Sequence, residues 1–392
     1  HDRYTDQRTL STDISIERQR KLEFSRSKID MEPLSIGSSP RRNKKVPRKA
    51  AWAAGGLVAV ALVVFALSRL SSPGGASEGG TSGRRGTSES VTFFVVGDWG
   101  REGTLNQTTV ADLMSKVAEG LADPPLAVFS TGDNMYPNGM NSSDDPLFER
   151  SFINVYNGRG LVGVPWYAVL GNHDYGDGFW TLCENDLDHA KCDRGPHHQL
   201  GDSLGRRDGR WNMPAPNYVR SFGNGLLDVF FLDTNPWIEE YRDTNWSPWN
   251  RQILLAEDWR KSLNTLDRRL SESDALVKIV VGHHPVRSNG DHGHNLDLVQ
   301  HLEPLLNEHG VKVYFSGHDH DLEHLKTKDM GFHQVVSGAG SDCTRGFHGT
   351  GSSIFQYPWK GFVSATVSKD ATIHVQFFTA ENGSSSVHSF TA

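Results

Sequence analysis

The sequence predicts an α/β protein whose C-terminal part forms antiparallel sheet. From Val91 to Phe315, short apolar runs of strand length alternate with longer segments that carry apolar residues at helical spacing. Strands that alternate with helices pair mainly in parallel. From Phe362 to Thr391, three short apolar segments follow one another with only turns between them, which favours antiparallel pairing. We therefore expect mixed sheets flanked by helices.

Each expected element follows from its local pattern. Val91–Val96 is a near-continuous apolar run that stops at Gly97, which is typical of a buried strand. Leu105–Leu121 has helical periodicity with a polar face. The same two patterns recur along the chain. The other expected strands are Leu126–Phe129, Trp166–Leu170, Leu227–Leu232, Leu276–Val281, Val311–Phe315, Phe362–Val367, Thr372–Phe378 and Val387–Thr391, and the other expected helices are Asn250–Leu270 and Leu296–His309.

Three segments precede the predicted globular domain, which spans residues 91–392. Residues 1–49 are polar and end in a basic run, so we expect a disordered tail there. Residues 50–70 include 19 consecutive uncharged, mostly apolar residues. As a helix they would be about 28 Å long, enough to span a bilayer. Residues 71–90 are rich in Gly and Ser, which is typical of a flexible linker.

The segment 50–70 has two interpretations. Six cationic residues precede the uncharged run Ala50–Ser68 and Arg69 alone follows it, which predicts a cytosolic tail and a lumenal or extracellular domain. We favour an uncleaved signal anchor, because the apolar run exceeds an ordinary signal-peptide core. The alternative is a signal peptide that starts at Met31 and is cleaved, which would give a secreted protein. Four glycosylation sequons follow the segment, at Asn106, Asn141, Asn245 and Asn382.

Composition excludes some functions. The chain has 40 basic and 47 acidic side chains and a formal net charge of -7, so it has no overall positive field for a nucleic acid partner. Its three cysteines are too few for a disulfide framework or a zinc cage. Cys183 and Cys192 are close enough in sequence to close a small loop, which would leave Cys343 free.

Five short polar motifs come directly after predicted strands. Each begins with glycine, which lets the chain turn sharply and brings backbone close to a ligand. In open α/β sheets, ligands bind where loops converge at the carboxyl ends of strands. One such motif alone is an ordinary turn, but the ordered combination predicts one site. The motifs are Gly97-Asp98-Trp99-Gly100, Gly132-Asp133-Asn134-Met135-Tyr136, Gly171-Asn172-His173-Asp174, Gly282-His283-His284-Pro285 and Gly317-His318-Asp319-His320.

The residue types in these motifs predict metal ions. Carboxylate oxygens, an amide oxygen and imidazole nitrogens together suit transition metals rather than Mg or Ca. Two ions held close together can clamp the attacking and leaving oxygens of a phosphoryl displacement and lower the pKa of a bound water. Asp133 is the candidate bridging ligand, because it lies in a central motif and Asp98 can then serve one ion alone. The sequence thus predicts a metal-dependent phosphoesterase with two ions.

In order and composition, the five motifs resemble those of the purple acid phosphatases, specifically the small tartrate-resistant type. The resemblance covers Val91 to Ala392. Tyr136 carries much of it, because most other metallophosphoesterases have no tyrosine there and begin with Gly-Asp-x-His rather than Gly97-Asp98-Trp99-Gly100. The resemblance implies a four-layer α-β-β-α metallophosphoesterase sandwich.

The resemblance also implies which residues hold the metals, with Asp133 shared between them. Fe(III) is favoured by a phenolate ligand, and the second, divalent ion is Fe, Zn or Mn. The expected ligands of Fe(III) are Asp98, Asp133, Tyr136 and His320. The expected ligands of the second ion are Asp133, Asn172, His283 and His318.

Two further histidines are catalytic candidates. His173 follows the ligand Asn172 directly, and His292 lies nine residues after His283, where the small type carries a second substrate-facing histidine. Either can protonate the leaving oxygen, because the acid form of histidine is available at mildly acidic pH. The resemblance implies an acid phosphatase that hydrolyses phosphate monoesters by attack of a metal-bound hydroxide. His284 is expected to lie behind the ligands.

Other features have plainer interpretations. Asp174 and Asp319 either orient neighbouring imidazoles or cap turns. Residues 176–215 are a candidate lid over the site. Trp237, Trp246 and Trp249 are expected in the core rather than at a cleft rim.

Two alternative functions use the same residues. One is a phosphodiesterase or phosphoprotein phosphatase on the same scaffold, which Tyr136 argues against. The other is a membrane-tethered binding glycoprotein with an inactive site, which the complete ligand set argues against. The expected substrates are small phosphomonoesters, with phosphoproteins as a further class. The sequence selects neither the substrate nor the oligomeric state, and it leaves redox cycling of an iron pair open.

Overall fold

The computed structural model describes residues 90–176, 195–243, 253–343, 345–349 and 351–392. The tail expected at 1–49, the apolar segment at 50–70 and nearly all of the linker at 71–90 lie outside these residues, as do Cys183, Cys192, Trp246 and Trp249. In the part of the chain that is described, no helix is both long enough and apolar enough to cross a membrane.

The described residues form two mixed sheets of seven strands each, in the orders β14-β13-β12-β1-β2-β3-β4 (sheet 1) and β11-β9-β10-β8-β7-β6-β5 (sheet 2). The strands of sheet 1 are β1 (Ser90–Val96), β2 (Ala127–Ser130), β3 (Trp166–Ala168), β4 (Trp211–Asn212), β12 (Gly361–Ser368), β13 (Ile373–Thr379) and β14 (Ser386–Thr391). The strands of sheet 2 are β5 (Tyr218–Phe222), β6 (Leu227–Phe231), β7 (Val277–Val281), β8 (Val313–Ser316), β9 (Leu322–Leu325), β10 (His333–Ser337) and β11 (Ser353–Tyr357).

The pairing confirms the predicted mixture of parallel and antiparallel strands. In sheet 1, β1 to β4 pair in parallel and β12 to β14 are antiparallel. In sheet 2, β6, β7, β8 and β10 pair in parallel, with antiparallel strands at both edges. The predicted fold class is therefore correct.

Three longer helices account for the predicted ones. They are α2 (Gln107–Glu119), α9 (Trp259–Glu272) and α10 (Leu296–Glu308). The helix expected at 250–270 is interrupted: residues 253–256 are helical, and α9 starts anew at Trp259, where Asp258 caps it by accepting from the backbone of Arg260 and Lys261. The short helices are α3 (Pro146–Phe148), η1 (Glu149–Ile153), η2 (His173–Tyr175), η3 (Pro196–His198), α6 (Ser203–Arg207), η4 (Asn235–Trp237) and α7 (Glu239–Asp243).

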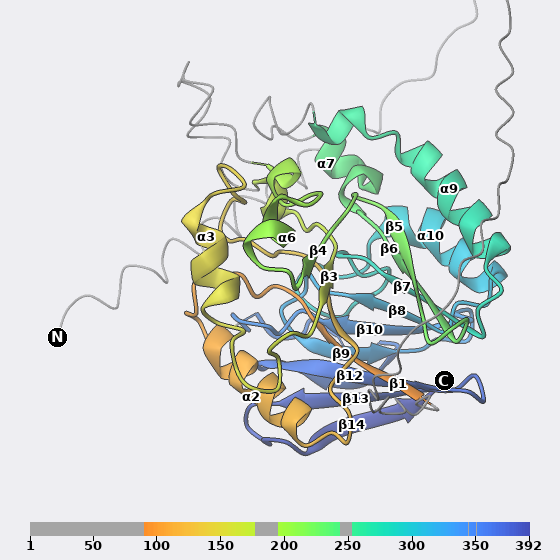
Figure 1. Ribbon diagram of the computed structural model, residues 1–392. Helices are drawn as coiled ribbons and strands as arrows, with labels where there is room; N and C mark the ends of the chain where they lie inside the picture. The colour runs from red at the N-terminus through yellow and green to blue at the C-terminus, as the bar shows by residue number, and fades with distance from the viewer. Residues whose placement is uncertain (1–89, 177–194, 244–252, 344, 350) are drawn as a thin grey trace, which may run out of the picture. The chain divides into compact units, whose positions relative to one another are not determined.

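The molecule has four layers, with the two sheets inside and the helices outside (Figure 1). Side chains that alternate along a strand pack on one side against the other sheet and on the other side against helices. Phe231 of β6 packs between the sheets, 5.3 Å from Phe129 of β2. Its neighbour Phe230 belongs to a second cluster with Leu266 of α9 and Leu302 of α10. Adjacent residues of a strand point to opposite faces, so one strand supplies both cores.

Four strands of sheet 2, β5, β9, β10 and β11, were not predicted. β9 contains Glu323 and His324, both of which are buried. The carboxylate of Glu323 accepts hydrogen bonds from the side chains of Ser288, Asn289 and Gln356. These partners are distant in sequence, so no local pattern reveals that a polar strand is buried here.

The structure tests only the later part of the candidate lid. Its residues 177–194 lie outside the described structure. Farther along, Trp211 is buried in β4, which pairs in parallel with β3 at the edge of sheet 1. That end of the segment therefore belongs to the sheet. Trp237 is buried, as expected for a core residue, and Cys343 is a free, buried cysteine.

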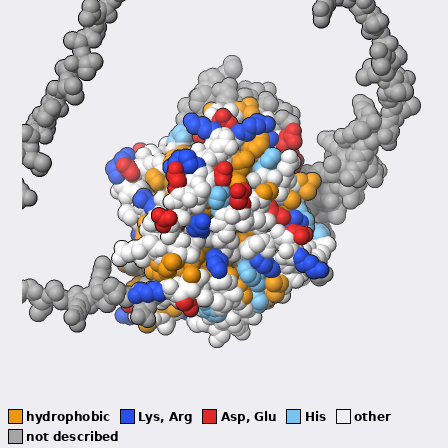
Figure 2. Space-filling view, turned by 90° about the vertical axis from the view of Figure 1, so that its right-hand side faces the viewer, with side chains coloured by type: hydrophobic (Ala, Val, Ile, Leu, Met, Phe, Trp, Pro, Cys, Tyr) orange, Lys and Arg blue, Asp and Glu red, His pale blue; other side chains and the backbone are white. Residues whose placement is uncertain are grey.

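One face of the surface is shown in Figure 2. Basic and acidic side chains are interspersed on it, with smaller apolar areas between them. Large exposed apolar side chains, such as Val162 and Leu296, come from different elements. This face shows no extensive patch of one charge, and the strand ends are the more informative region.

Candidate metal centre

All five motifs lie after strands, as predicted. Asp98, Asp133 and Asn172 follow β1, β2 and β3, which are neighbours in sheet 1. His283 and His318 follow β7 and β8, which are neighbours in sheet 2. The backbone N–H of His318 donates to Asp98 Oδ2 at 3.0 Å and so joins the loops of the two sheets. The carboxyl ends of five strands therefore meet at one place.

Tyr136 lies at the centre of a first group of side chains. Its hydroxyl oxygen is 2.8 Å from Asp133 Oδ2, 3.3 Å from Asp98 Oδ1 and 3.1 Å from His320 Nε2. All four side chains are buried. One possible ligand atom from each of Asp98, Asp133 and His320 lies within 4.8 Å of the others. These are the four residues expected to hold one ion.

Asn172 has the corresponding position in a second group. Its Oδ1 is 3.0 Å from His283 Nε2 and 3.1 Å from His318 Nδ1. Asp133 faces both groups, because its Oδ2 contacts Tyr136 while its Oδ1 is 3.5 Å from His283 Nε2. The seven predicted ligands thus come together around one shared carboxylate.

His284 lies beside the second group but has other partners. One nitrogen of His284 is within 4.8 Å of nitrogens of His283 and His318, so these three imidazoles are also a geometric metal site. However, His284 Nδ1 is 2.8 Å from Thr234 Oγ1, and its Nε2 is 3.1 Å from the hydroxyl of Tyr241. Because both ring nitrogens have partners, Asn172 is the better candidate ligand.

The polar atoms of the first group have too few protons to satisfy one another by hydrogen bonds, whereas a cation would suit them all. The hydroxyl of Tyr136 has a single proton, yet it is surrounded by oxygens of Asp98 and Asp133 and by a nitrogen of His320. Within the described residues, only histidines lie at ion-pair distance from these two carboxylates. Buried carboxylates without a full counter-charge are expected to pair with a metal or to take up a proton.

The second group supports the same conclusion. His283 Nδ1 lies 2.8 Å from the carbonyl oxygen of Thr131, so in the neutral form of the ring this nitrogen carries the proton. The Nε2 of His283 then presents a lone pair to the side-chain oxygen of Asn172. Two facing lone pairs repel each other unless a cation lies between them. The donor set and its arrangement therefore fit metal ions.

Burial makes the charges of the site interdependent. It raises the pKa of Asp98 to about 8, and the negative charge of Asp133 adds to this shift. For Asp133, burial is the largest single effect and acts in the same direction, but His283, His173 and the hydrogen bonds from His173 and Tyr136 together outweigh it, so the pKa stays below its usual range. Burial lowers the pKa of His320 to about 3. A bound cation would stabilise both ionised carboxylates and the neutral imidazole together.

Three candidate ligands have backbone angles that are unusual for residues other than glycine. The φ angle is 60° at Asp98, 53° at Asp133 and 69° at His318. Such conformations cost about 1–3 kcal/mol each and cluster at functional sites. The motif glycines make room for the carboxylates: a Cβ on Gly171 would lie 2.1 Å from Asp133 Oδ1, and one on Gly317 would lie 2.3 Å from Asp98 Oδ2.

Asp174 connects two of the ligand loops. Its buried carboxylate accepts from the backbone N–H groups of Gly171, Asn134 and Met135 at 2.9, 3.0 and 3.0 Å. It also accepts from Gln199 Nε2 at 2.8 Å. The loop after β2 is thereby fixed to the loop after β3. Asp174 orients the ligand loops rather than an imidazole.

In each predicted catalytic histidine, Nδ1 is held by an oxygen of the protein. His173 Nδ1 is 2.7 Å from the carbonyl oxygen of Pro137, and its Nε2 is 4.0 Å from Asp133 Oδ2. His292 Nδ1 is 2.8 Å from Asp319 Oδ1, which also accepts from the backbone of His292. Asp319 therefore orients an imidazole, one of the two roles predicted for it.

Sequence reasoning missed two arginines at the site. The guanidinium of Arg101 lies 3.6 Å from the ring centroid of Tyr136. Arg345 Nη1 lies 3.2 Å from His292 Nε2. Arg101 directly follows the first motif, and this position in the sequence could have indicated that it lies at the site. Arg345 follows no predicted strand and has no local signal.

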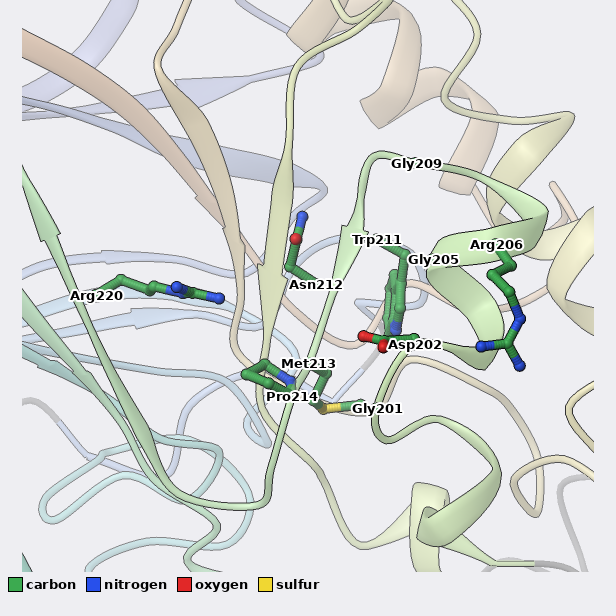
Figure 3. Close-up of a pocket in the computed structure, with 10 residues that line it drawn as sticks. All are labelled: Gly201, Asp202, Gly205, Arg206, Gly209, Trp211, Asn212, Met213, Pro214 and Arg220. Carbon is green, nitrogen blue, oxygen red and sulfur yellow. The ribbon is translucent and has the colours of Figure 1, made fainter. Parts of the chain in front are cut away.

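A separate cavity of about 380 Å³ lies along β4 and includes none of the candidate ligands (Figure 3). Arg220 and Arg206 lie on opposite sides of it, with Trp211 and Asn212 between them. Both arginines are exposed. We assign no function to this cavity.

The part of the sequence that contains the site is similar to known proteins. Residues 91–322 match the calcineurin-like phosphoesterase family. The chain is 37% identical over 301 residues to purple acid phosphatase 3 of Arabidopsis thaliana, which covers 74% of this chain and 75% of the relative. It is 30% identical over 265 residues to tartrate-resistant acid phosphatase type 5 of Homo sapiens, which covers 65% of this chain and 74% of the relative.

A solved structure shows the same fold. The purple acid phosphatase from seeds of yellow lupin (Lupinus luteus) is similar with a TM-score of 0.54 at 16% sequence identity, over 77% of this chain and 53% of that protein. Taken with the arrangement of the site, the sequence matches establish that the chain belongs to the calcineurin-like phosphoesterases and, within them, to the purple acid phosphatases, and that it is a hydrolase.

Proposed function

We propose that this protein is an acid phosphatase that hydrolyses phosphate monoesters at a dinuclear centre of Fe(III) and a divalent Fe, Zn or Mn ion. The observation that carries the proposal is the position of Tyr136, whose hydroxyl lies among Asp98, Asp133 and His320. A phenolate in such a carboxylate and imidazole set suits ferric iron. When bound, two ions would lower the pKa of a water molecule and neutralise charge on the phosphoryl oxygens.

The proposed ligands divide at Asp133, whose two oxygens face different groups. The first ion would be held by Asp98, Asp133, Tyr136 and His320, and the second by Asp133, Asn172, His283 and His318. Thr131 supports this assignment, because its carbonyl fixes the ring of His283 and leaves Nε2 free for a metal.

His173 and His292 are the proposed proton donors to the leaving oxygen. The carbonyl of Pro137 holds Nδ1 of His173, and Asp319 holds Nδ1 of His292. In His173, Nε2 is then the nitrogen that can carry the transferable proton, whereas Nε2 of His292 accepts from Arg345 and would have to leave that partner to carry one. Both side chains are partly exposed, so a substrate can reach them.

Metal analysis and visible absorption of the purified chain test this function. We expect about two metal ions per chain, at least one of them iron, together with a visible charge-transfer band. Tyr136→Phe should remove the band. Two ions without a band in the wild-type protein would support a metallophosphoesterase without an iron–phenolate bond. A chain that binds no metal would contradict the proposal and favour the binding glycoprotein.

For localisation, we propose that residues 91–392 form a catalytic domain on the lumenal or extracellular side. The apolar segment 50–70 would be a membrane anchor or a cleaved signal peptide, after a cytosolic tail at 1–49 and before a linker at 71–90. Of the four sequon residues, three lie in the described structure, and Asn106, Asn141 and Asn382 are all exposed. Glycosidase treatment and carbonate extraction of membranes test this. A glycosylated protein that stays in the membrane supports the anchor, one in the medium supports cleavage, and an unglycosylated soluble protein contradicts both.

A further inference from the structure

Arg345 lies at the rim of the candidate metal centre, next to a histidine already proposed to face the substrate. Its Nη1 is 3.2 Å from His292 Nε2. The ring of His292 in turn stacks on the ring of His318, with 3.9 Å between centroids and 30° between planes. The guanidinium is therefore separated from a candidate ligand by a single imidazole.

The segment that carries Arg345 follows β10, and its beginning is joined to the first ligand loop. The N–H of Gly97 donates to the carbonyl of Ser337 at 2.8 Å, and the N–H of Gly340 donates to the carbonyl of Gly97 at 3.1 Å. The hydroxyl of Ser341 donates to the carbonyl of Asp98. The position of this segment is thus set by the same loop that places a candidate ligand.

The far end of the segment is joined to the loop of His292. The N–H of His348 donates to the carbonyl of Asn289 at 2.8 Å. His348 Nε2 lies 2.9 Å from Asp291 Oδ1. Contacts on both sides of Arg345 therefore keep it near the centre, although the arginine itself is exposed.

The charge of Arg345 is available to an anion. No described carboxylate forms an ion pair with it, and its one described polar partner is a ring nitrogen of His292. A guanidinium stays protonated at any working pH and presents several N–H groups that match phosphate oxygens.

We infer that Arg345 binds a terminal oxygen of the substrate phosphoryl group and thereby favours monoesters over diesters. The inference rests on the proposed function. Near neutral pH a phosphate monoester carries close to two negative charges, because its second pKa is about 6. A diester carries one and has an organic group in place of a terminal oxygen. A fixed guanidinium therefore stabilises the bound monoester more than the bound diester.

The test compares Arg345→Gln and Arg345→Lys with Arg220→Gln in the metal-loaded full chain. Arg220 is a matched control, because it is an exposed arginine in the cavity along β4. At pH 7, Arg345→Gln should raise KM for p-nitrophenyl phosphate, and Kd for inorganic phosphate, by about tenfold or more. KM for bis(p-nitrophenyl) phosphate should change less than about threefold. Arg345→Lys should recover part of the loss, and Arg220→Gln should resemble wild type.

Several results would overturn the inference. If Arg345→Gln raises KM equally for the monoester and the diester, Arg345 attracts both substrates by its charge and does not favour monoesters. If Arg345→Gln has the same KM and Kd as Arg220→Gln, Arg345 does not bind the phosphoryl group. A wild-type protein that hydrolyses neither ester would refute the proposed function instead, and calorimetric binding of inorganic phosphate by the wild type and the three variants would still decide whether Arg345 binds the anion.

Discussion

Two groups of histidines begin close together in the sequence but have different surroundings. In the metal centre, His318 and His320 follow β8 and face carboxylate and amide oxygens. Four residues after His320, His324 of β9 begins a second group. Its Nδ1 lies 3.0 Å from His388 Nε2, and its Nε2 lies 2.8 Å from His333 Nδ1. Neutral imidazoles can satisfy both contacts by each donating to the next.

The second group shows what a histidine cluster lacks when it is not a metal site. His324 stacks on Phe390 with 3.8 Å between ring centroids. The charged groups that act on His324 are its two histidine neighbours and Lys326, with no carboxylate among them. The metal centre, in contrast, contains two buried carboxylates and facing lone pairs. Carboxylates and unsatisfied acceptors, more than histidines, therefore identify the metal site.

Replacement of the shared carboxylate should have the largest effect. In Asp133→Asn, we expect metal content to fall below two ions per chain and kcat/KM to fall at least about a hundredfold, because changes to outer partners of metal ligands already cost 10–100-fold. The metal-free variant should be less stable than metal-free wild type near neutral pH, because the pKa of Asp133 lies below its usual range and the fold therefore stabilises its ionised carboxylate through His283 and His173. Metal analysis, kinetics and thermal melts check this. A variant with full metal content and activity would show that Asp133 is not a shared ligand.

Asp174→Asn should have the next largest effect. Its carboxylate holds the loops of Asp133 and Asn172 together through backbone N–H groups. We expect metal affinity to fall about 10–100-fold, measured by competition with a chelator. Asp145→Asn is a matched control, because Asp145 accepts from the backbone of Leu147 at the start of α3. The control should lower thermal stability but leave metal affinity unchanged, and equal loss of affinity in both variants would contradict a specific role for Asp174.

His284→Gln should reduce kcat/KM by less than about tenfold, because its partners Thr234 and Tyr241 can also bond to an amide. The variant should keep both ions, whereas His283→Gln should lose metal. Metal analysis of the two variants checks this difference. Equal losses would mean that the three imidazoles of His283, His284 and His318 form the true second site.

The smallest expected effect is a loss of stability at acid pH that is caused by the second histidine group. Burial lowers the pKa of His324 from 6.5 to about 3 and that of His333 from 6.5 to about 4. Above pH 6.5 these groups are neutral in folded and unfolded chains alike. Below it the unfolded chain binds more protons, so the stability of the fold should fall as pH drops toward 4.

We expect a melting temperature about 5 °C lower at pH 5 than at pH 7, with part of that difference absent in His324→Leu. His374→Gln is the control, because His374 lies on β13 outside the group and bonds to Thr391. Calorimetry at the two pH values checks this. Identical pH dependence in all three proteins would show that the group does not control acid stability.

The site was more predictable than the sheets. The motifs around Asp98, Asp133 and Asn172 are local signals, because an apolar run and a glycine mark the end of a strand. The parallel strands that carry them were therefore found. β9 was missed because its polar residues are buried by tertiary hydrogen bonds to Glu323, which leave no periodic pattern.

By itself, the sequence determined the fold class, the strand-end position of the motifs and the chemical type of the ligands, because each depends on residues close together in the chain. The tertiary structure alone decided that Asp133 faces both groups, that both nitrogens of His284 have partners outside the metal centre, and that Arg345 adjoins His292. These contacts join residues far apart in sequence. They depend on how two sheets pack and where their loops meet, which no local pattern encodes.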